Sequence, residues 1–148
     1  MLKLDIGKES FPIQFSNGEK AEIYFNPDDP GLAIRLKNFK NIVPEKIAAI
    51  KDVEITNNGT PSIEQGVEVI ERFEKIEKII FDELDKAFGG DISAVVFKYC
   101  SPFALVKGDF YIIRFLEAMI AEIQKRESKS VTKREEIYNK YLSKYGKK

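Results

Sequence analysis

The chain has 148 residues, of which 43% are hydrophobic and 32% are charged, and its formal net charge at pH 7 is zero. This mixture is typical of a folded globular protein and excludes a disordered chain. Zero net charge also removes any general electrostatic attraction to nucleic acid or to an anionic membrane, so neither is an expected partner.

The first quarter of the chain predicts β-strands. Apolar and polar residues alternate over residues 11–15 and 21–25, the pattern of strands that are buried on one face. Asn17 and Gly18 lie between them, and an Asn-Gly pair is the strongest short signal for a β-hairpin. Residues 2–6 alternate in the same way, so we expect a third strand. Because a lone hairpin is marginally stable in water, the sheet should pack on the helices that follow.

A helix should begin at the Asn-Pro-Asp-Asp-Pro segment of residues 26–30, with Asp29 as its N-cap. Pro44 should end or kink this helix, because proline lacks a backbone N–H and its ring crowds the preceding turn. A second helical piece, residues 44–50, should continue in nearly the same direction. The polar residues 56–60 then predict a loop.

The longest helix should begin at Thr60 or Ser62, either of which can cap it, and end at the two glycines of residues 89–90. Apolar residues recur every three or four positions along it, which is the spacing of one helix face. These residues are Ile63, Val67, Ile70, Ile76, Ile80, Leu84 and Phe88.

Two further helices complete the expected elements. A short helix should run from a cap at Asp91 or Ser93 to Tyr99. The last helix should start at residues 108–109 and bend or fray over the polar residues 127–132. Its apolar stripe consists of Phe110, Ile113, Leu116, Ile120 and Ile123.

These elements predict the α+β class, with a small N-terminal antiparallel β-hairpin or sheet packed on a mainly α-helical body that ends in a long C-terminal helix. We expect a single domain over residues 1–148. Within it, residues 1–27 should form the hairpin region, residues 28–126 the helical body, and residues 127–148 a basic helical tail.

Charge is unevenly placed along the chain. Residues 124–148 contain nine basic and three acidic side chains, which makes this segment +6 and leaves −6 on residues 1–123. A basic tail on an acidic body fits self-association or the capture of a charged partner. It fits equally an ordinary solvated helix whose lysines lie near its negative dipole end.

Few side chains that catalysis or metal binding requires are present. The chain has no histidine, so its single cysteine, Cys100, has no histidine to activate it. Clusters of Cys and His for zinc and glycine motifs for phosphate are missing. Asp82, Glu83 and Asp85 share a helix with lysines at the spacing of surface ion pairs, which explains them structurally. We therefore expect no enzyme activity, no catalytic residue, no metal and no cofactor.

The single cysteine and the N-terminal residues indicate the cellular compartment of the protein. A lone cysteine fits a reducing compartment and excludes an internal disulfide framework. Residues 1–5 alternate charged and apolar side chains, unlike a signal peptide, and no apolar run reaches the length of a membrane span. We expect a cytoplasmic location.

Aromatic side chains gather in two places that are candidates for protein binding. The first is the segment of residues 99–111, which contains two helix breakers and either covers the core or forms an interface. Its candidate residues are Tyr99, Phe103, Phe110 and Tyr111. The second is a tyrosine stripe on the basic tail, for which oligomer contact and packing on the domain remain equal alternatives. It consists of Tyr138, Tyr141 and Tyr145.

The order of the elements and several short motifs resemble those of the tail assembly chaperones of long-tailed phages and prophages of Gram-positive bacteria. The motifs span nearly the whole chain: the acidic proline turn, Leu-Lys-Asn-Phe, the acidic helix ending in Phe-Gly-Gly, Val-Val-Phe, and Phe-Leu-Glu-Ala-Met-Ile. They lie at residues 26–30, 36–39, 81–90, 95–97 and 115–120, before a Lys-, Arg- and Tyr-rich end. Residues 98–107 depart from the family, which has a Phe-Gly and an Asn-rich turn there.

This resemblance implies a role in the cytoplasm of the bacterial host. Such chaperones bind the long hydrophobic tape measure protein, keep it soluble, help the tail tube protein polymerise around it, and leave before the virion is complete. Expected partners are therefore the tape measure protein and the major tail tube protein, with a homo-oligomer also open. Two alternatives remain: a structural tail or virion component, and a phage-encoded inhibitor that binds a host protein.

Overall fold

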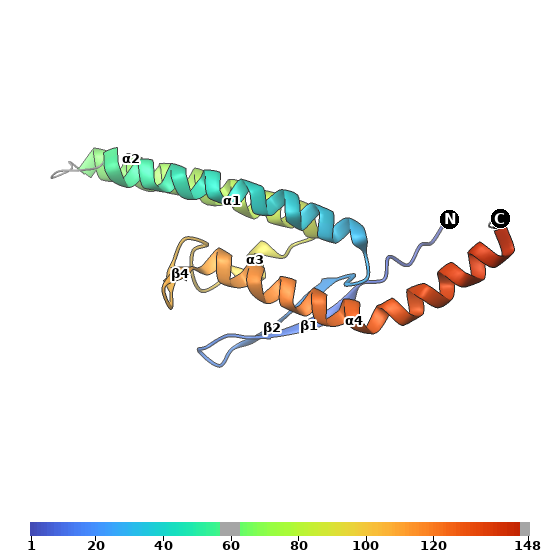
Figure 1. Ribbon diagram of the computed structural model, residues 1–148. Coiled ribbons are helices and arrows are strands. Elements are labelled where there is room, and N and C mark those ends of the chain that lie inside the picture. Colours follow the sequence, from blue (N-terminus) through green and yellow to red (C-terminus); the bar gives the residue numbers. More distant parts are fainter. Residues whose placement is uncertain (57–62, 146–148) are drawn as a thin grey trace.

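A β-hairpin, a long pair of helices and a bent C-terminal helix make up the structure (Figure 1). The computed structural model describes residues 1–56 and 63–145, so the helix caps expected at Thr60 and Ser62 lie outside the described residues. The α+β prediction is confirmed, since a small antiparallel hairpin precedes a mostly helical body. In chain order the elements are β1 (Glu9–Gln14), β2 (Lys20–Phe25), α1 (Pro30–Thr56), α2 (Ile63–Phe88), α3 (Ser93–Val96), β3 (Leu105–Val106), β4 (Asp109–Phe110) and α4 (Tyr111–Tyr145).

Strands β1 and β2 pair antiparallel, with Phe11 opposite Ile23 and Gln14 opposite Lys20. A loop of residues 15–19 joins them, and in it the Gly18 N–H donates to the Phe15 carbonyl at 2.9 Å. Gly18 has a φ of 89°, a conformation that glycine adopts without steric cost, so the Asn-Gly signal marks this turn correctly.

The expected third strand is wrong. Residues 2–6 form no strand, and their apolar side chains are exposed. The physical reason lies in the register: β2 ends at Phe25, opposite Glu9, and the chain then turns into α1. Residues 2–6 therefore have no strand opposite them with which to pair.

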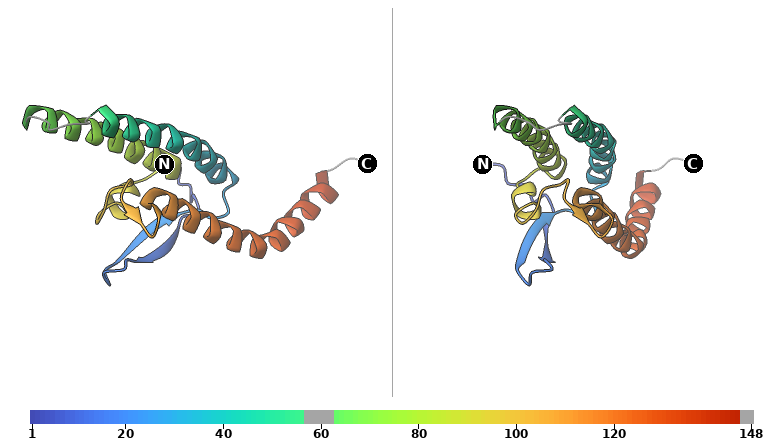
Figure 2. Two further views of the ribbon diagram at one scale, coloured as in Figure 1. Left: turned by 60° about the vertical axis from the view of Figure 1, so that its left-hand side comes forward. Right: turned by 90° about the vertical axis from the view of Figure 1, so that its left-hand side faces the viewer.

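Helices α1 and α2 run side by side along most of their length (Figures 1 and 2). Asp29 caps α1 as expected, because its Oδ1 accepts the Gly31 N–H at 2.8 Å. Pro44 neither ends α1 nor separates a second piece, since the helix continues through it to Thr56. Buried side chains lie on both sides of the proline: Phe39, Val43 and Ile50. Their packing stabilises a continuous helix and outweighs the intrinsic cost of the proline.

The hydrophobic core lies where the base of the helix pair meets the hairpin, α3 and the first half of α4. Phe25, Phe39, Ile80, Leu84 and Ile112 are each at most 1% exposed. The apolar stripe of α2 is thus buried only toward its C-terminal end, whereas Val67 and Ile70 nearer its start are about half exposed. The periodicity predicts one stripe along the whole helix, and burial of that stripe is wrong for the outer part of α2.

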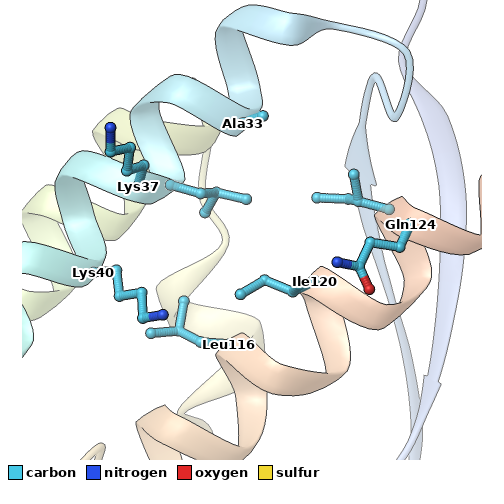
Figure 3. Close-up of a pocket in the computed structure, with 8 residues that line it drawn as sticks. Ala33, Lys37, Lys40, Leu116, Ile120 and Gln124 are labelled. Atoms are coloured by element: carbon cyan, nitrogen blue, oxygen red, sulfur yellow. The ribbon is translucent and has the colours of Figure 1, made fainter. Parts of the chain in front are cut away.

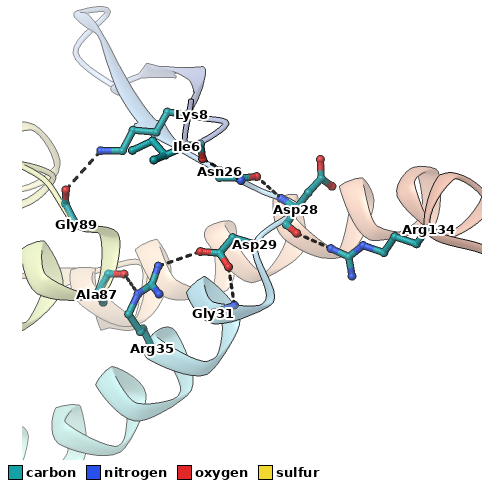
Figure 4. A network of polar contacts seen from close by, with 10 residues as sticks. All are labelled: Ile6, Lys8, Asn26, Asp28, Asp29, Gly31, Arg35, Ala87, Gly89 and Arg134. Atoms are coloured by element: carbon teal, nitrogen blue, oxygen red, sulfur yellow. Dashed lines mark hydrogen bonds and ion pairs between the residues drawn. The ribbon is translucent and has the colours of Figure 1, made fainter. Parts of the chain in front are cut away.

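A polar junction at the start of α1 ties four segments together (Figure 4). The Asn26 side chain donates to the Ile6 carbonyl at 3.1 Å, and Arg35 Nε donates to the Ala87 carbonyl near the end of α2 at 2.7 Å. Arg35 also pairs with Asp29 at 3.2 Å. Arg134 of α4 donates to the Asp28 carbonyl at 2.6 Å, so the junction also fixes the direction of the C-terminal helix.

Helix α4 is continuous from Tyr111 to Tyr145 but changes direction partway, and its last part projects from the body (Figure 2). The bend agrees with the expectation for residues 127–132. Arg126 holds the helix before the bend through a 3.3 Å ion pair with Glu9. Among the described residues, no helix combines the length and the apolar character needed to cross a membrane.

Candidate protein-binding surfaces

The aromatic segment of residues 99–111 folds against one end of the body. A tight hairpin of β3 and β4 forms there, with Leu105 opposite Phe110. Its two turn residues, Lys107 and Gly108, both have positive φ values of 50° and 85°, as a two-residue hairpin turn requires. We expected a helix start at residues 108–109 and missed this hairpin, although a glycine between alternating apolar residues is its sequence signal.

Three of the four candidate aromatics in this segment pack on the core. Phe103 and Phe110 meet edge to face with ring centroids 6.2 Å apart, and both contact the buried cluster. The Tyr111 hydroxyl donates to the Val96 carbonyl at 2.8 Å. Tyr99 differs, because it is 44% exposed and meets the Phe15 ring of the hairpin loop at 4.9 Å. Within this segment, Tyr99 therefore presents the largest aromatic surface to a partner.

The tyrosine stripe lies at the other end of α4, so the structure does not bring the two sets of candidate residues together (Figure 1). Tyr138 and Tyr141 are 59% and 51% exposed, and the Tyr145 side chain lies outside the described residues. Ile137 and Leu142 flank the tyrosines and are 51% and 65% exposed. We name these four residues, Ile137, Tyr138, Tyr141 and Leu142, the tail stripe; their spacing places them on one side of the helix.

Two apolar hollows flank the first half of α4. The first, the hairpin groove, lies between the β-hairpin and α4 and has a volume of about 360 Å³. Its lining is aromatic and aliphatic, with Glu122 as its only charged side chain. Its lining includes Phe11, Phe15, Phe25, Tyr111, Phe115 and Met119.

The second hollow, the helix groove, lies between α1 and α4 and has a volume of about 300 Å³ (Figure 3). Its apolar surface comes from Leu36, Leu116, Ile120, Ile123 and Ala33. Lys37 and Lys40 on α1 and Gln124 on α4 add polar groups, and Lys40 extends from α1 toward α4. Periodicity assigned Leu116, Ile120 and Ile123 to one apolar stripe, but it did not reveal that part of this stripe lines an open groove.

Among the described residues, no group of three His, Cys, Asp or Glu side chains is placed to hold a metal ion. Cys100 is partly buried, and this burial raises the pKa of its thiol above the ordinary value. Burial also raises the pKa of the nearby Tyr111 hydroxyl, with a smaller contribution from Cys100.

The raised pKa of Cys100 predicts that its thiol reacts slowly with alkylating reagents. Because the thiolate is the nucleophile, a raised pKa lowers the reactive fraction at neutral and mildly alkaline pH. At a pH of about 8, we expect iodoacetamide to alkylate the native protein several-fold more slowly than the urea-unfolded chain. The difference should shrink as the pH rises through the native pKa. Mass spectrometry of timed samples measures both rates, and equal rates at pH 8 would contradict a shielded thiol.

Comparisons of this chain with protein-family models, with curated proteins and with solved structures found no match.

Proposed function

We propose that this protein is a tail assembly chaperone of a long-tailed bacteriophage, and that it acts in the host cytoplasm. It binds the tape measure protein, keeps that protein soluble, assists assembly of the tail tube around it, and is absent from the finished virion. The motif order of the sequence supports this proposal. So does the open apolar surface along α4, which lines two grooves and carries the tail stripe.

The exposure of the tail stripe is the strongest structural support for this proposal. Tyr138 and Leu142 are more than half exposed on a helix that projects from the body (Figure 2). Burial of each large apolar side chain against a partner contributes about 1.5–3 kcal/mol. Tyrosine is suited to a surface that is alternately covered and free, because its ring is apolar and its hydroxyl stays hydrated. Such a surface fits an apolar client segment that the chaperone later releases.

Binding to a long apolar client also accounts for the presence of two separate apolar surfaces on one molecule. The hairpin groove lies against the first half of α4 and the tail stripe lies near its end, so one molecule offers separate sites to a client segment that passes along it. Several weak contacts on one chain raise the total affinity while each contact stays individually reversible.

Co-expression with the tape measure protein of the same genome tests the proposal. We expect the client to be soluble with the wild-type chain and insoluble without it. The paired substitution Tyr138→Ser and Leu142→Ser should lower the soluble client at least about tenfold, since two large apolar contacts are lost. Both side chains are exposed, so the variant should fold normally. Glu136→Ser with Asn139→Ser, on the opposite side of the same helix, is the matched control.

Two results would contradict the proposal. One is a client that is no more soluble with this protein than without it. The other is detection of the chain in purified virions by mass spectrometry, which would favour a structural tail component. Loss of client solubility with the control pair would show that the effect is not specific to the tail stripe.

A further inference from the structure

The hairpin groove combines an apolar surface with one carboxylate. Glu122 is the only charged side chain in a lining that is otherwise apolar or aromatic. It is partly buried, and its carboxylate forms no ion pair or hydrogen bond among the described residues. In the same part of the chain no buried side-chain oxygen lacks a partner, so this unpaired carboxylate is still in contact with water.

The cations that follow Glu122 on α4 do not neutralise it. Lys125 and Arg126 lie three and four residues after it, the spacing of helical ion pairs, but neither pairs with it. The Arg126 guanidinium instead pairs with Glu9 at 3.3 Å and lies over the Phe11 ring at 4.9 Å. This contact holds Arg126 against the hairpin and leaves the carboxylate in the groove without a cation.

The wall that α4 contributes to the groove is apolar until it reaches this carboxylate. Tyr111, Phe115 and Met119 recur every four residues before Glu122, so all four side chains lie on one side of the helix. The 11 residues from Tyr111 to Glu122 correspond to about 16 Å at 1.5 Å per residue. An occupant that lies along this wall therefore meets aromatic and aliphatic side chains first and a carboxylate at the end.

The carboxylate of Glu122 restricts which segments can cover the groove. A wholly apolar occupant would displace water from Glu122 and leave an unpaired charge in an apolar contact, which is unfavourable. An acidic occupant would add repulsion between like charges. A lysine or arginine beside the apolar side chains replaces the lost water with a charge-assisted hydrogen bond. Charge complementarity thus favours an apolar segment that carries a cation at one end.

We propose that the hairpin groove binds client segments in which a lysine or arginine lies beside a cluster of large apolar side chains. The apolar side chains pack against Phe115 and Met119, and the cation pairs with Glu122. This inference deepens the proposed function and rests on it, because the occupant is a segment of the tape measure protein. The tail stripe lies on a basic helix, so the two surfaces prefer client segments of different charge.

Peptide binding to the purified full-length chain tests the inference. The probes are short, overlapping, fluorescein-labelled peptides that cover the tape measure protein of the same genome, and fluorescence polarisation measures their affinity. We expect the peptides that bind the groove to carry a lysine or arginine next to large apolar residues. Norleucine in place of that cation keeps an unbranched side chain but removes the charge. It should weaken binding at least about tenfold.

Substitutions on α4 locate the bound peptides. Glu122→Gln removes the charge at nearly constant size and should weaken cationic peptides at least about tenfold, but not their norleucine versions. Glu122→Lys should reverse the preference and favour peptides in which glutamate replaces the cation. Ala118→Trp, at an exposed position in the lining, should block both kinds of peptide. Glu117→Gln makes the same charge change at an exposed position outside the lining and should bind like the wild type.

Four outcomes would overturn the inference. One is that no peptide binds. Another is equal affinity for cationic peptides and their norleucine versions, which would mean that Glu122 exerts no selection. A third is unchanged binding to Ala118→Trp when circular dichroism shows that this variant is folded, which would place the peptides outside the groove. The fourth is dissociation of an oligomer of the chain by Ala118→Trp in sedimentation velocity, which would make a second copy the occupant.

The co-expression experiment separates failure of this inference from failure of the proposed function. A client that stays soluble with Ala118→Trp but not with Tyr138→Ser and Leu142→Ser would preserve the chaperone role and overturn the inference. Peptides that bind through Glu122, although the client gains no solubility from the wild-type chain, would support the inference and contradict the chaperone role.

Discussion

Replacing Phe25 by alanine is expected to lower the free energy of unfolding by about 3–5 kcal/mol, because the change deletes a buried ring and leaves a cavity. Phe25 is 1% exposed. Its ring stacks on Phe11 with centroids 4.0 Å apart and meets the Phe88 ring edge to face at 5.6 Å. Phe25 thus joins the hairpin to the end of α2, and small domains have only about 5–15 kcal/mol of stability in total.

Urea unfolding followed by circular dichroism measures this loss. The control is Tyr24→Ala on the same strand, since Tyr24 is 50% exposed and points to the other face of the hairpin. It should cost less than about 1 kcal/mol. Phe25→Leu keeps most of the apolar volume and should fall between the two. Equal losses for Phe25→Ala and Tyr24→Ala would contradict the packing of the hairpin on α2.

The elements that sequence reasoning predicted correctly have strong local signals. The hairpin follows from alternation around Asn17 and Gly18, and the start of α1 follows from Asp29. In these places the residues that determine the structure lie within a few positions of one another. Local chemistry is then sufficient to predict the element.

The errors arise where distant parts of the chain decide the outcome. Residues 2–6 alternate like a strand, but a strand also needs a partner, and none lies opposite them because β2 ends at Phe25, opposite Glu9. Pro44 disfavours a continuous helix locally, yet the packing of α1 on α2 keeps the helix intact. Neither the missing partner nor the packing is visible in a local pattern.

The candidate surfaces divide in the same way. Tyr138 and Tyr141 could be found from sequence, because an apolar stripe close to the terminus has little core to join. The helix groove could not be found from sequence, because it forms only where α1 and α4 lie near each other in the folded chain. Periodicity shows that Leu116 and Ile120 share a helix face, but it does not show whether another element covers that face.

Asp85 is a second case in which a long-range contact replaces the local expectation. The spacing of charges in α2 indicated a surface ion pair for the carboxylates of residues 82–85. Asp82 does form one, with Lys78 at 2.9 Å, whereas Asp85 reaches beyond the end of its own helix. Its Oδ1 accepts the backbone N–H groups of Ile92 and Ser93 at 2.9 and 2.7 Å, and its Oδ2 accepts the Ser93 hydroxyl at 2.7 Å.

These bonds give α3 the N-terminal cap that its own sequence lacks. Ile92 occupies the N-cap position and has no polar side chain with which to accept a hydrogen bond. Ser93 is 7% exposed and Ile92 is 4% exposed, so water does not readily replace the carboxylate. Asp85→Ala should therefore cost about 3 kcal/mol, because the Ser93 N–H and hydroxyl lose their acceptor in a largely buried position. The Ile92 N–H loses one of its two acceptors and keeps the Gly90 carbonyl at 3.0 Å.

The matched control is Asp82→Ala, three residues earlier on the same helix. Its ion pair with Lys78 has both side chains mostly exposed, so its loss should cost less than about 0.5 kcal/mol. Asp85→Asn keeps one carbonyl acceptor and should cost about 1 kcal/mol. Adding Ser93→Ala to Asp85→Ala should cost less than the sum of the two single changes, because the serine hydroxyl has then already lost its acceptor. Equal losses for Asp85→Ala and Asp82→Ala in urea unfolding would show that Asp85 is a solvated surface residue after all.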